Sequence, residues 1–209
     1  RRGGGVVVAL GQCGVRGYEF GAHVGWETVS EGTGRVARWE RGTGVEGDRW
    51  TAFFSRDGFL SRYCTDGREL LAEGASLRPQ FWRAPTENDL GAALDRRQGV
   101  WKNPEMKLES FEARQAEAGA VVTARYSLPG TGASLTLVYR IDGAGAMPVQ
   151  ARMEARAEEA PPLFRFGMTM EMPACYDPIR YYGRGAHETY ADRLSSADLG
   201  LSVQRTSDQ

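Results

Sequence analysis

Polar and aromatic side chains that could recognise a sugar are concentrated in the segment RPQFWRAPTENDLG, residues 78–91. Pro85 fixes its own φ and biases the residue before it toward extended backbone, so this loop is expected to be stiff. A pyranose offers hydroxyl groups to carboxylates and amides, and an apolar face to an aromatic ring. The loop supplies all of these groups, in Phe81, Trp82, Arg83, Asn88 and Asp89.

Each of these side chains also has a structural interpretation. Asp89 would cap a helix that follows it, and Arg83 would pair with Glu87 or Asp89. Phe81 and Trp82 would then be core residues. Polar clusters in loops often satisfy neighbouring backbone groups instead of a ligand, so for any single residue the structural interpretation is the stronger one.

A second polar segment, YYGRGAHETYADR at residues 181–193, carries the adjacent pair His187 and Glu188. A G-x-G-x-x-G phosphate loop is excluded, because Glu188 stands where the third glycine is needed. A Ser-His-Asp triad built on His187 would need a G-x-S-x-G elbow, which the sequence lacks. The two glycines instead suit a sharply turning connection.

Metal and thiol chemistry have little support in the sequence. Glu87 and Asp89 could begin a hard-cation site, but no D-x-D-x-D-G loop or second carboxylate cluster accompanies them. The three cysteines are odd in number and lack C-x-x-C spacing, which argues against a disulfide framework and a zinc site. This usage fits a reducing compartment, so we expect a cytoplasmic protein.

The composition indicates a globular chain with a substantial core. Of its 209 residues, 41% are hydrophobic and 25% are charged. The formal net charge of -1 provides no concentrated basic surface for nucleic acid or an anionic membrane. No apolar run approaches the roughly 20 residues that cross a bilayer. Nucleic acid and membrane partners are therefore not expected.

Alternating apolar residues and turn signals predict antiparallel strands that position these loops. Asp57-Gly58 and Asp66-Gly67 favour tight hairpin turns, because both central residues of such a turn tolerate positive φ. Short turns also separate the later runs, so successive strands are expected to be antiparallel neighbours. These runs span residues 120–128, 133–141, 146–156 and 163–172.

One short helix is predicted at residues 89–99, with Asp89 capping its start and Gly99 ending it. The predicted fold class is therefore all-β, an antiparallel sandwich with one short helix. Residues 1–47 are glycine-rich and hold only short candidate strands. We place a boundary there and assign residues 48–209 to the main domain.

Three irregular motifs follow one another along the chain. They are the segment from FFSRDGF to RAPTENDLG at residues 53–91, the turn YRIDGAG at 139–145, and YYGRGAHETYADRLSSADLG at 181–200. Together they resemble the C-terminal small-chain domain of bacterial β-galactosidases of glycoside hydrolase family 2. The strand HVGWETV at residues 23–29 resembles the end of a preceding immunoglobulin-like domain. Ala186 and Thr189 depart from the proline and asparagine usual in the third motif.

This resemblance implies a galactose mutarotase-like super-sandwich, incomplete at its C-terminal end and without catalytic residues. In the family, the catalytic glutamates and the ligands of magnesium and sodium lie in other domains of a longer, homo-oligomeric parent. The implied parent hydrolyses terminal β-D-galactosides such as lactose with retention. This chain would bind no metal and would contact the parent's other domains and the galactoside. The residues expected at the substrate cleft or domain interface are Arg83, Asn88, Asp89, His187 and Glu188, with Phe81 and Trp82 as an aromatic platform.

Two other functions stay open. A free-standing, mutarotase-like carbohydrate-binding module would use the two rings and the polar loops. A mutarotase proper has less support, because His187 and Glu188 are sequence neighbours, and neighbouring side chains on a strand point to opposite faces. A sandwich that ends at Gln209, before the last strands of the family, would have open edges, so a marginal monomer is expected.

Overall fold

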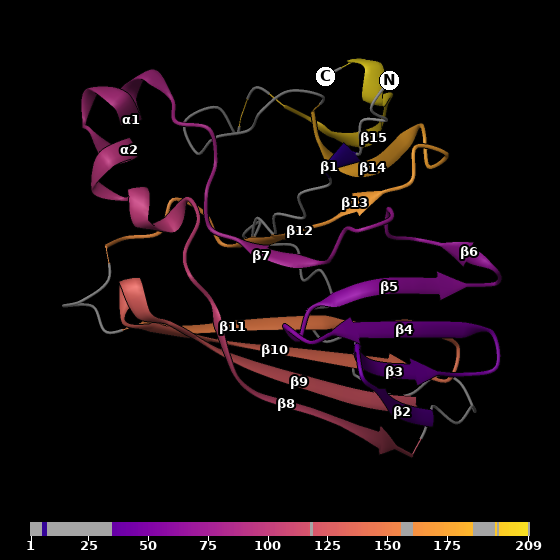
Figure 1. Cartoon of the computed structure of the whole chain (residues 1–209). Coiled ribbons are helices and arrows are strands. Elements are labelled where there is room, and N and C mark those ends of the chain that lie inside the picture. Colours follow the sequence, from indigo (N-terminus) through magenta and orange to yellow (C-terminus); the bar gives the residue numbers. More distant parts are fainter. Residues whose placement is uncertain are drawn as a thin grey trace.

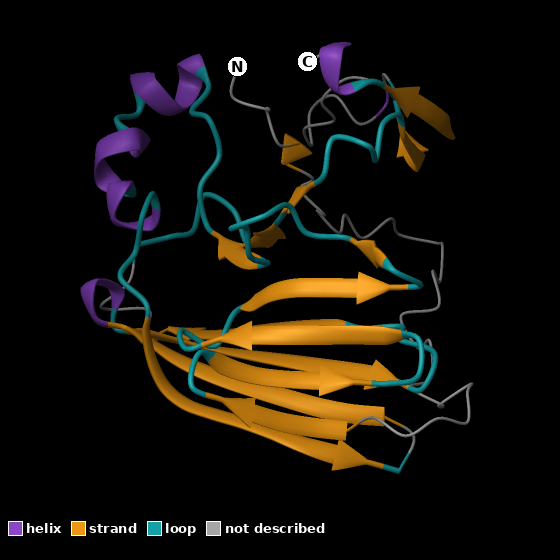
Figure 2. Cartoon of the chain, turned by 45° about the vertical axis from the view of Figure 1, so that its right-hand side comes forward, coloured by secondary structure: helices purple, strands orange, loops and turns teal. Residues whose placement is uncertain are grey.

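The computed structural model describes residues 6–7, 35–117, 119–155, 161–185, 195 and 197–208. Within this part of the chain, two antiparallel sheets lie face to face, and short two-stranded ladders and the helices lie above them in the view of Figure 1. Figure 2 shows the same layers from a second direction. The prediction of an all-β antiparallel sandwich with little helix is confirmed.

The first sheet is a five-stranded meander whose strand order follows the sequence. Its strands are β2 (Arg35–Trp39), β3 (Gly42–Glu46), β4 (Trp50–Ser55), β5 (Leu60–Thr65) and β6 (Arg68–Glu69). Both predicted hairpins are present, and the β5–β6 turn has Asp66 at φ 50° and Gly67 at φ 74°, as an Asp-Gly turn requires. Because residues 35–46 form β2 and β3, a boundary near residue 47 would divide this sheet.

The second sheet has four strands in the order β11, β10, β9, β8. They are β8 (Lys107–Ala116), β9 (Gly119–Leu128), β10 (Ala133–Asp142) and β11 (Val149–Ala155), with the 3-10 helix η2 (Pro129–Thr131) after β9. The last three strands match predicted runs. Strand β8 is not predicted, because its alternation is interrupted by a register shift between Leu108 and Ser110.

The core lies between the two sheets and follows from the alternation of their strands. Along β10, every second side chain is at most 5% exposed. Rings from the two sheets meet there: Phe54 is edge-on to Tyr139 at 4.9 Å between centroids, and Phe59 stacks on Tyr126 at 4.8 Å. These contacts join the sheets into one hydrophobic core.

The turn after β10, in the motif YRIDGAG, packs against β4 and β5 of the other sheet. The Trp50 indole N–H donates to the carbonyl of Gly143 at 3.0 Å, and the Tyr63 hydroxyl donates to the carbonyl of Gly145. Gly145 has φ 90°, and a Cβ there would lie 2.8 Å from the Trp50 ring. The last glycine of the motif therefore lets the turn pack over a buried tryptophan.

Three short ladders lie above the sandwich in the described part of the chain. Strand β7 (Arg78–Gln80) pairs with β12 (Gly167–Thr169), β1 (Val6–Val7) with β13 (Glu171–Met172), and β14 (Ile179–Arg184) with β15 (Leu199–Gln204). The 3-10 helix η4 (Thr206–Asp208) follows β15. The prediction of one strand over residues 163–172 is wrong, because this run divides between β12 and β13, which pair with different strands.

The helical segment is more broken than predicted. It consists of α1 (Glu87–Gly91), α2 (Leu94–Arg97) and the 3-10 helix η1 (Gly99–Trp101). Ala93 has a left-handed φ of 54°, which interrupts the predicted single helix. The prediction that Asp89 is the N-cap is wrong, since Thr86 occupies that position. Among the described residues, no helix is long and apolar enough to cross a membrane.

Candidate functional site

The loop between β7 and α1 is held by the paired side chains of Arg83 and Asp89. Arg83 Nη1 donates to Asp89 Oδ2 at 2.6 Å, and its Nη2 donates to Oδ1 at 3.1 Å. The Asp89 side chain is 10% exposed and that of Arg83 is 27% exposed. A two-point pair in a partly buried position fixes the direction of both side chains. This contact matches the structural interpretation, with Asp89 as the partner of Arg83.

Asp89 also accepts hydrogen bonds from Thr86, through the backbone N–H at 2.7 Å and Oγ1 at 2.9 Å. The Asp89 N–H donates in return to Thr86 Oγ1 at 3.3 Å, which completes a capping box at the start of α1. The hydrogen bond from Arg83, followed by that from the Thr86 backbone, lowers the pKa of Asp89 to about 2. Asp89 is therefore ionised at neutral pH and acts as an acceptor, not as a proton donor.

An aromatic ring holds the Arg83 guanidinium from another side. Arg83 lies over the Phe164 ring at 4.9 Å from its centroid, and Trp82 meets Phe164 edge-on at 4.7 Å. Arg83 also donates to the carbonyl of Ala84 at 3.1 Å. The Arg83 guanidinium therefore holds the loop in its conformation. A ligand would be contacted by other side chains of the loop.

Phe81 lies in the core instead of forming an exposed platform. It is 2% exposed and packs against Trp101, at 5.6 Å, and Phe166, at 5.9 Å between centroids. Its ring therefore offers no face to a sugar in this structure. The ring at the surface is Phe166, which is 42% exposed. Sequence reasoning missed Phe164 and Phe166 as partners of the loop, although their alternation is visible in the sequence.

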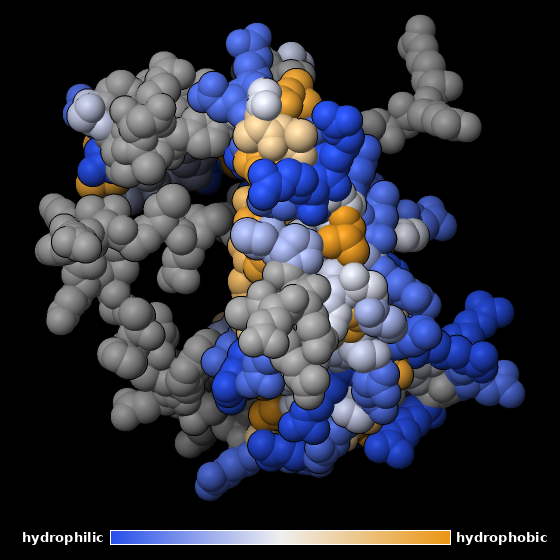
Figure 3. Space-filling view, turned by 90° about the vertical axis from the view of Figure 1, so that its left-hand side faces the viewer, coloured by the Kyte–Doolittle hydropathy of each residue, from blue (hydrophilic) through white to orange (hydrophobic). Residues whose placement is uncertain are grey.

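The exposed groups of the loop are in the first turn of α1. Glu87 and Asn88 are both exposed, and Leu90 is 54% exposed. Figure 3 faces the side of the molecule that carries this helix and shows hydrophobic residues at the surface among hydrophilic ones. The loop thus presents an amide, a carboxylate and an apolar side chain from a rigid base. Such a set can meet a hydroxyl-rich ligand or another protein surface.

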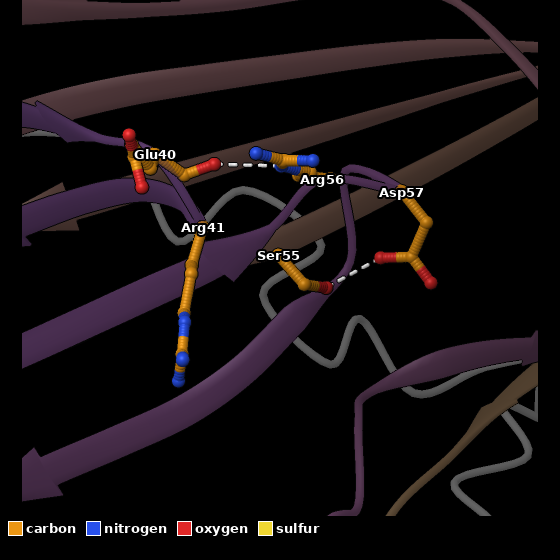
Figure 4. A pocket seen from close by; sticks show the side chains of 5 residues that line it. All are labelled: Glu40, Arg41, Ser55, Arg56 and Asp57. Carbon is orange, nitrogen blue, oxygen red and sulfur yellow. Dashed lines mark hydrogen bonds between the residues drawn. The ribbon is translucent and has the colours of Figure 1, made fainter.

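A separate open pocket of about 590 Å³ lies between the β2–β3 turn and the β4–β5 turn, as Figure 4 shows. Its lining residues are Glu40, Arg41, Ser55, Arg56 and Asp57. Arg56 Nε donates to the carbonyl of Glu40 at 2.6 Å. Asp57 accepts from Ser55 and, at 2.6 Å, from Arg78. These bonds tie neighbouring turns together, and none of the predicted site residues that the structure describes lines this pocket.

The described residues contain no group of three or more His, Cys, Asp or Glu that could hold a metal ion. The carboxylate pair considered in the sequence does not fit a cation either. Both Asp89 oxygens accept hydrogen bonds from Arg83 or Thr86, and Glu87 is exposed beside them. A hard cation would need those oxygens as its own ligands.

Comparison with known proteins decides the family. The family model described as beta galactosidase small chain matches residues 46–209, which is more than half of the chain. The chain belongs to this family. The resemblance inferred from the three sequence motifs is thereby confirmed.

Curated relatives of this small-chain domain are much longer proteins. A β-galactosidase of Priestia megaterium is 34% identical over 160 residues, which cover 75% of this chain and 15% of the relative. A β-galactosidase of Lactobacillus delbrueckii subsp. bulgaricus is 33% identical over 162 residues, 76% of this chain and 16% of the relative. One of Streptococcus thermophilus is 28% identical over 199 residues, 92% of this chain and 19% of the relative. The chain thus spans about one-sixth of the length of the first two relatives.

Part of the third motif of the small-chain domain lies outside the described residues. This part includes His187 and Glu188, together with the substituted positions Ala186 and Thr189. The strand predicted at residues 23–29 also lies outside the described part. The placement of His187 and Glu188 at a cleft or interface therefore stays a prediction.

Proposed function

We propose that the chain is a non-catalytic domain of a β-galactosidase that hydrolyses terminal β-D-galactosides, lactose among them. The observation that carries the proposal is the family match over residues 46–209. The relatives named β-galactosidase support it, because the chain spans only 15% to 19% of their length. A parent of similar length would hold its chemistry in other domains, and those domains would be the partners of this one.

In this proposal the parent hydrolyses its substrate with retention, through two carboxyl groups that the present chain does not supply. One of the two must act as an acid, and its surroundings must raise its pKa. The pKa of Asp89 is lowered to about 2, first by the hydrogen bond from Arg83, so this carboxyl group does not suit the role of the acid. Magnesium and sodium, which the resemblance implies, would likewise be bound by other domains.

The loop of residues 81–89 is proposed to line the approach to the parent's active site. Its exposed Asn88 would meet a galactoside hydroxyl or a neighbouring domain, while Arg83 and Asp89 keep it in position. His187 and Glu188 are proposed for the same rim. The parent is proposed to be a cytoplasmic homo-oligomer.

The proposal is tested in the full-length parent with Asn88→Ala. One lost hydrogen bond of about 1 kcal/mol should raise KM for lactose roughly fivefold and leave kcat near that of the wild type. Arg83→Ala should act in the same direction by releasing the loop, and Gln150→Ser, at an exposed position of β11, serves as the control.

Proton NMR of the first-formed sugar anomer reports retention. A wild-type parent without β-galactosidase activity would contradict the proposal.

One observation favours the second candidate, a free-standing carbohydrate-binding module. Phe166 is 42% exposed and stacks on Phe81 of the polar loop, so a ring is accessible beside it. Titration of the isolated chain with galactose and lactose distinguishes the two functions. Saturable binding at millimolar sugar that is lost in Phe166→Ala would favour the module, and no binding at these concentrations would remove it.

A further inference from the structure

Three Asp-Gly sequences of this chain lie at turns, and they differ in how firmly the aspartate is held. They are Asp57-Gly58, Asp66-Gly67 and Asp142-Gly143. At such a sequence the glycine nitrogen can attack the aspartate Cγ, because no Cβ on the glycine shields that nitrogen. The attack requires an accessible carboxyl group, an accessible N–H and a turn that can open. Whether a site reacts therefore depends on its contacts in the fold.

Asp57-Gly58 is closed to this attack on both sides. Asp57 Oδ1 accepts a hydrogen bond from the Ser55 hydroxyl, and Oδ2 accepts one from Arg78 Nη2 at 2.6 Å. Gly58 is buried, and its N–H donates to the Ser55 carbonyl at 2.9 Å. Both reacting groups are thus occupied, and the turn that carries them is covered.

Asp142-Gly143 is held by backbone donors of its own turn. Asp142 Oδ1 accepts from the N–H groups of Ala144 and Ala146, both at 2.9 Å. On the other side of this turn, the buried Trp50 indole donates to the carbonyl of Gly143 at 3.0 Å. Opening the turn would break these hydrogen bonds and uncover a core ring, so it should be rare.

Asp66-Gly67 differs from the other two, because both of its residues are exposed. The Asp66 carboxylate pairs with Arg49 at 2.6 Å, but the two side chains are 52% and 78% exposed, so water competes with this contact. The Gly67 N–H makes no hydrogen bond with another described residue. Nothing lies within 4 Å of the position of a Cβ on Gly67. The carboxyl group and the nitrogen are therefore both accessible.

The tip of this hairpin can open without unfolding the sheet. Strand β6 is at the edge of the first sheet, as Figure 1 shows, and its register with β5 has the pairs Cys64–Glu69 and Thr65–Arg68. Short ladders at a sheet edge open at a lower free energy than core strands. Asp66 also has a left-handed φ of 50°, which is unfavourable for a residue with a Cβ, so opening releases this conformation.

We propose that Asp66 is a site of spontaneous isomerisation to isoaspartate. The Gly67 nitrogen bonds to Asp66 Cγ, the bond from Cγ to its hydroxyl breaks, and the hydroxyl leaves with the amide proton as water. Water then adds to the main-chain carbonyl of the cyclic imide and breaks its bond to the nitrogen, so the chain runs through Cγ. Water is released and then consumed, and the mass is unchanged. The added methylene lengthens the turn and disturbs the Thr65–Arg68 pair.

The test is incubation of the wild-type 209-residue chain in warm buffer at neutral pH, followed by tryptic mapping. Cleavage after arginine places each Asp-Gly sequence in its own peptide, at residues 57–62, 63–68 and 141–152. Electron-transfer fragmentation and reversed-phase retention distinguish isoaspartate from aspartate at equal mass. We expect isoaspartate in peptide 63–68 to form about fivefold faster than in the other two, because their turns open less often. In concentrated urea the three rates should become similar, because the contacts of the fold are lost.

Asp66→Glu tests the assignment to this residue. Glutamate keeps a carboxylate for Arg49 but would have to close a larger ring, so the modification of peptide 63–68 should disappear while the other two peptides keep their rates. Asp48→Glu, at an exposed aspartate that no glycine follows, is the matched control and should leave the rate at Asp66 unchanged.

Three outcomes would overturn the isomerisation proposal. One is equal rates at the three sites in the folded chain, or a faster rate at Asp57 or Asp142. Another is no isoaspartate at Asp66 over a period in which the chain in urea forms it there. The third is a modification of peptide 63–68 that persists in Asp66→Glu.

Discussion

At the scale of single residues, Arg83 and Asp89 show how side chains that suit a ligand can be used by the loop that carries them. Asp89 accepts from Arg83 and Thr86, and the Arg83 guanidinium also lies over Phe164. Asn88, like its neighbour Glu87, is left exposed. A role for Arg83 and Asp89 at the cleft stays a prediction. In that role the two residues would act indirectly, by fixing the position of Asn88.

Asp89→Asn should remove a pH-dependent contribution to stability. The pKa of Asp89 is about 2 in the folded chain and 3.8 ordinarily, so the unfolded chain binds more protons between these values. The stabilisation is therefore complete above about pH 4 and is lost as the pH falls through 2. We expect the Tm difference between wild type and variant to be largest above pH 4 and to shrink toward pH 2. A difference that stays constant over this range would contradict the assigned pair.

Two buried tyrosines should respond in opposite ways to loss of the hydroxyl. The Tyr63 hydroxyl donates to the carbonyl of Gly145, so Tyr63→Phe leaves a buried acceptor and should cost about 1–3 kcal/mol. The Tyr126 hydroxyl is buried without a hydrogen-bond partner among the described residues, so Tyr126→Phe should be neutral or stabilising by up to about 1 kcal/mol. Urea unfolding of both variants measures these free energies. Equal costs would refute the assignment of the Tyr63 contact.

At the scale of elements, turns and strands that depend on neighbouring residues are predictable from this sequence. The pairing of strands that lie far apart in the chain is not. The Asp66-Gly67 turn is recognisable because the φ angles it needs are local properties of those two residues. The division of residues 163–172 between two strands cannot be recognised from local sequence, because β12 pairs with β7, which lies far earlier in the chain. Likewise, nothing local indicates that Ala93 takes a left-handed φ and breaks the helix.

Gly145→Ala should be considerably more destabilising than Gly74→Ala. Both glycines have a left-handed φ, 90° and 78°, so each substitution pays a conformational cost of about 1 kcal/mol. A Cβ on Gly145 would also lie 2.8 Å from the Trp50 ring, whereas nothing lies within 4 Å at Gly74. We expect roughly 2–4 kcal/mol for Gly145→Ala, from strain and overpacking together. Similar unfolding free energies for the two variants would show that the turn does not pack on Trp50.

At the scale of the whole molecule, the sandwich is predictable because one buried face demands period-two alternation, which β9 and β10 display clearly. The candidate site is predictable only in part. The Arg83–Asp89 contact follows from neighbouring residues of opposite charge. The rings of Phe164 and Phe166 reach the loop through the fold, and no local pattern reveals that meeting. The proposed function rests on the family match and not on the fold, because a β-sandwich supports many activities.

The central claim is that this small-chain domain takes part in β-galactosidase activity without catalysing it alone. The most direct measurement is the hydrolysis of a chromogenic β-galactoside by the purified 209-residue chain, beside the full-length parent at equal molarity. We predict a rate for the chain equal to that of buffer, and turnover by the parent. Hydrolysis that co-purifies with the chain from a host lacking its own β-galactosidase would contradict the claim.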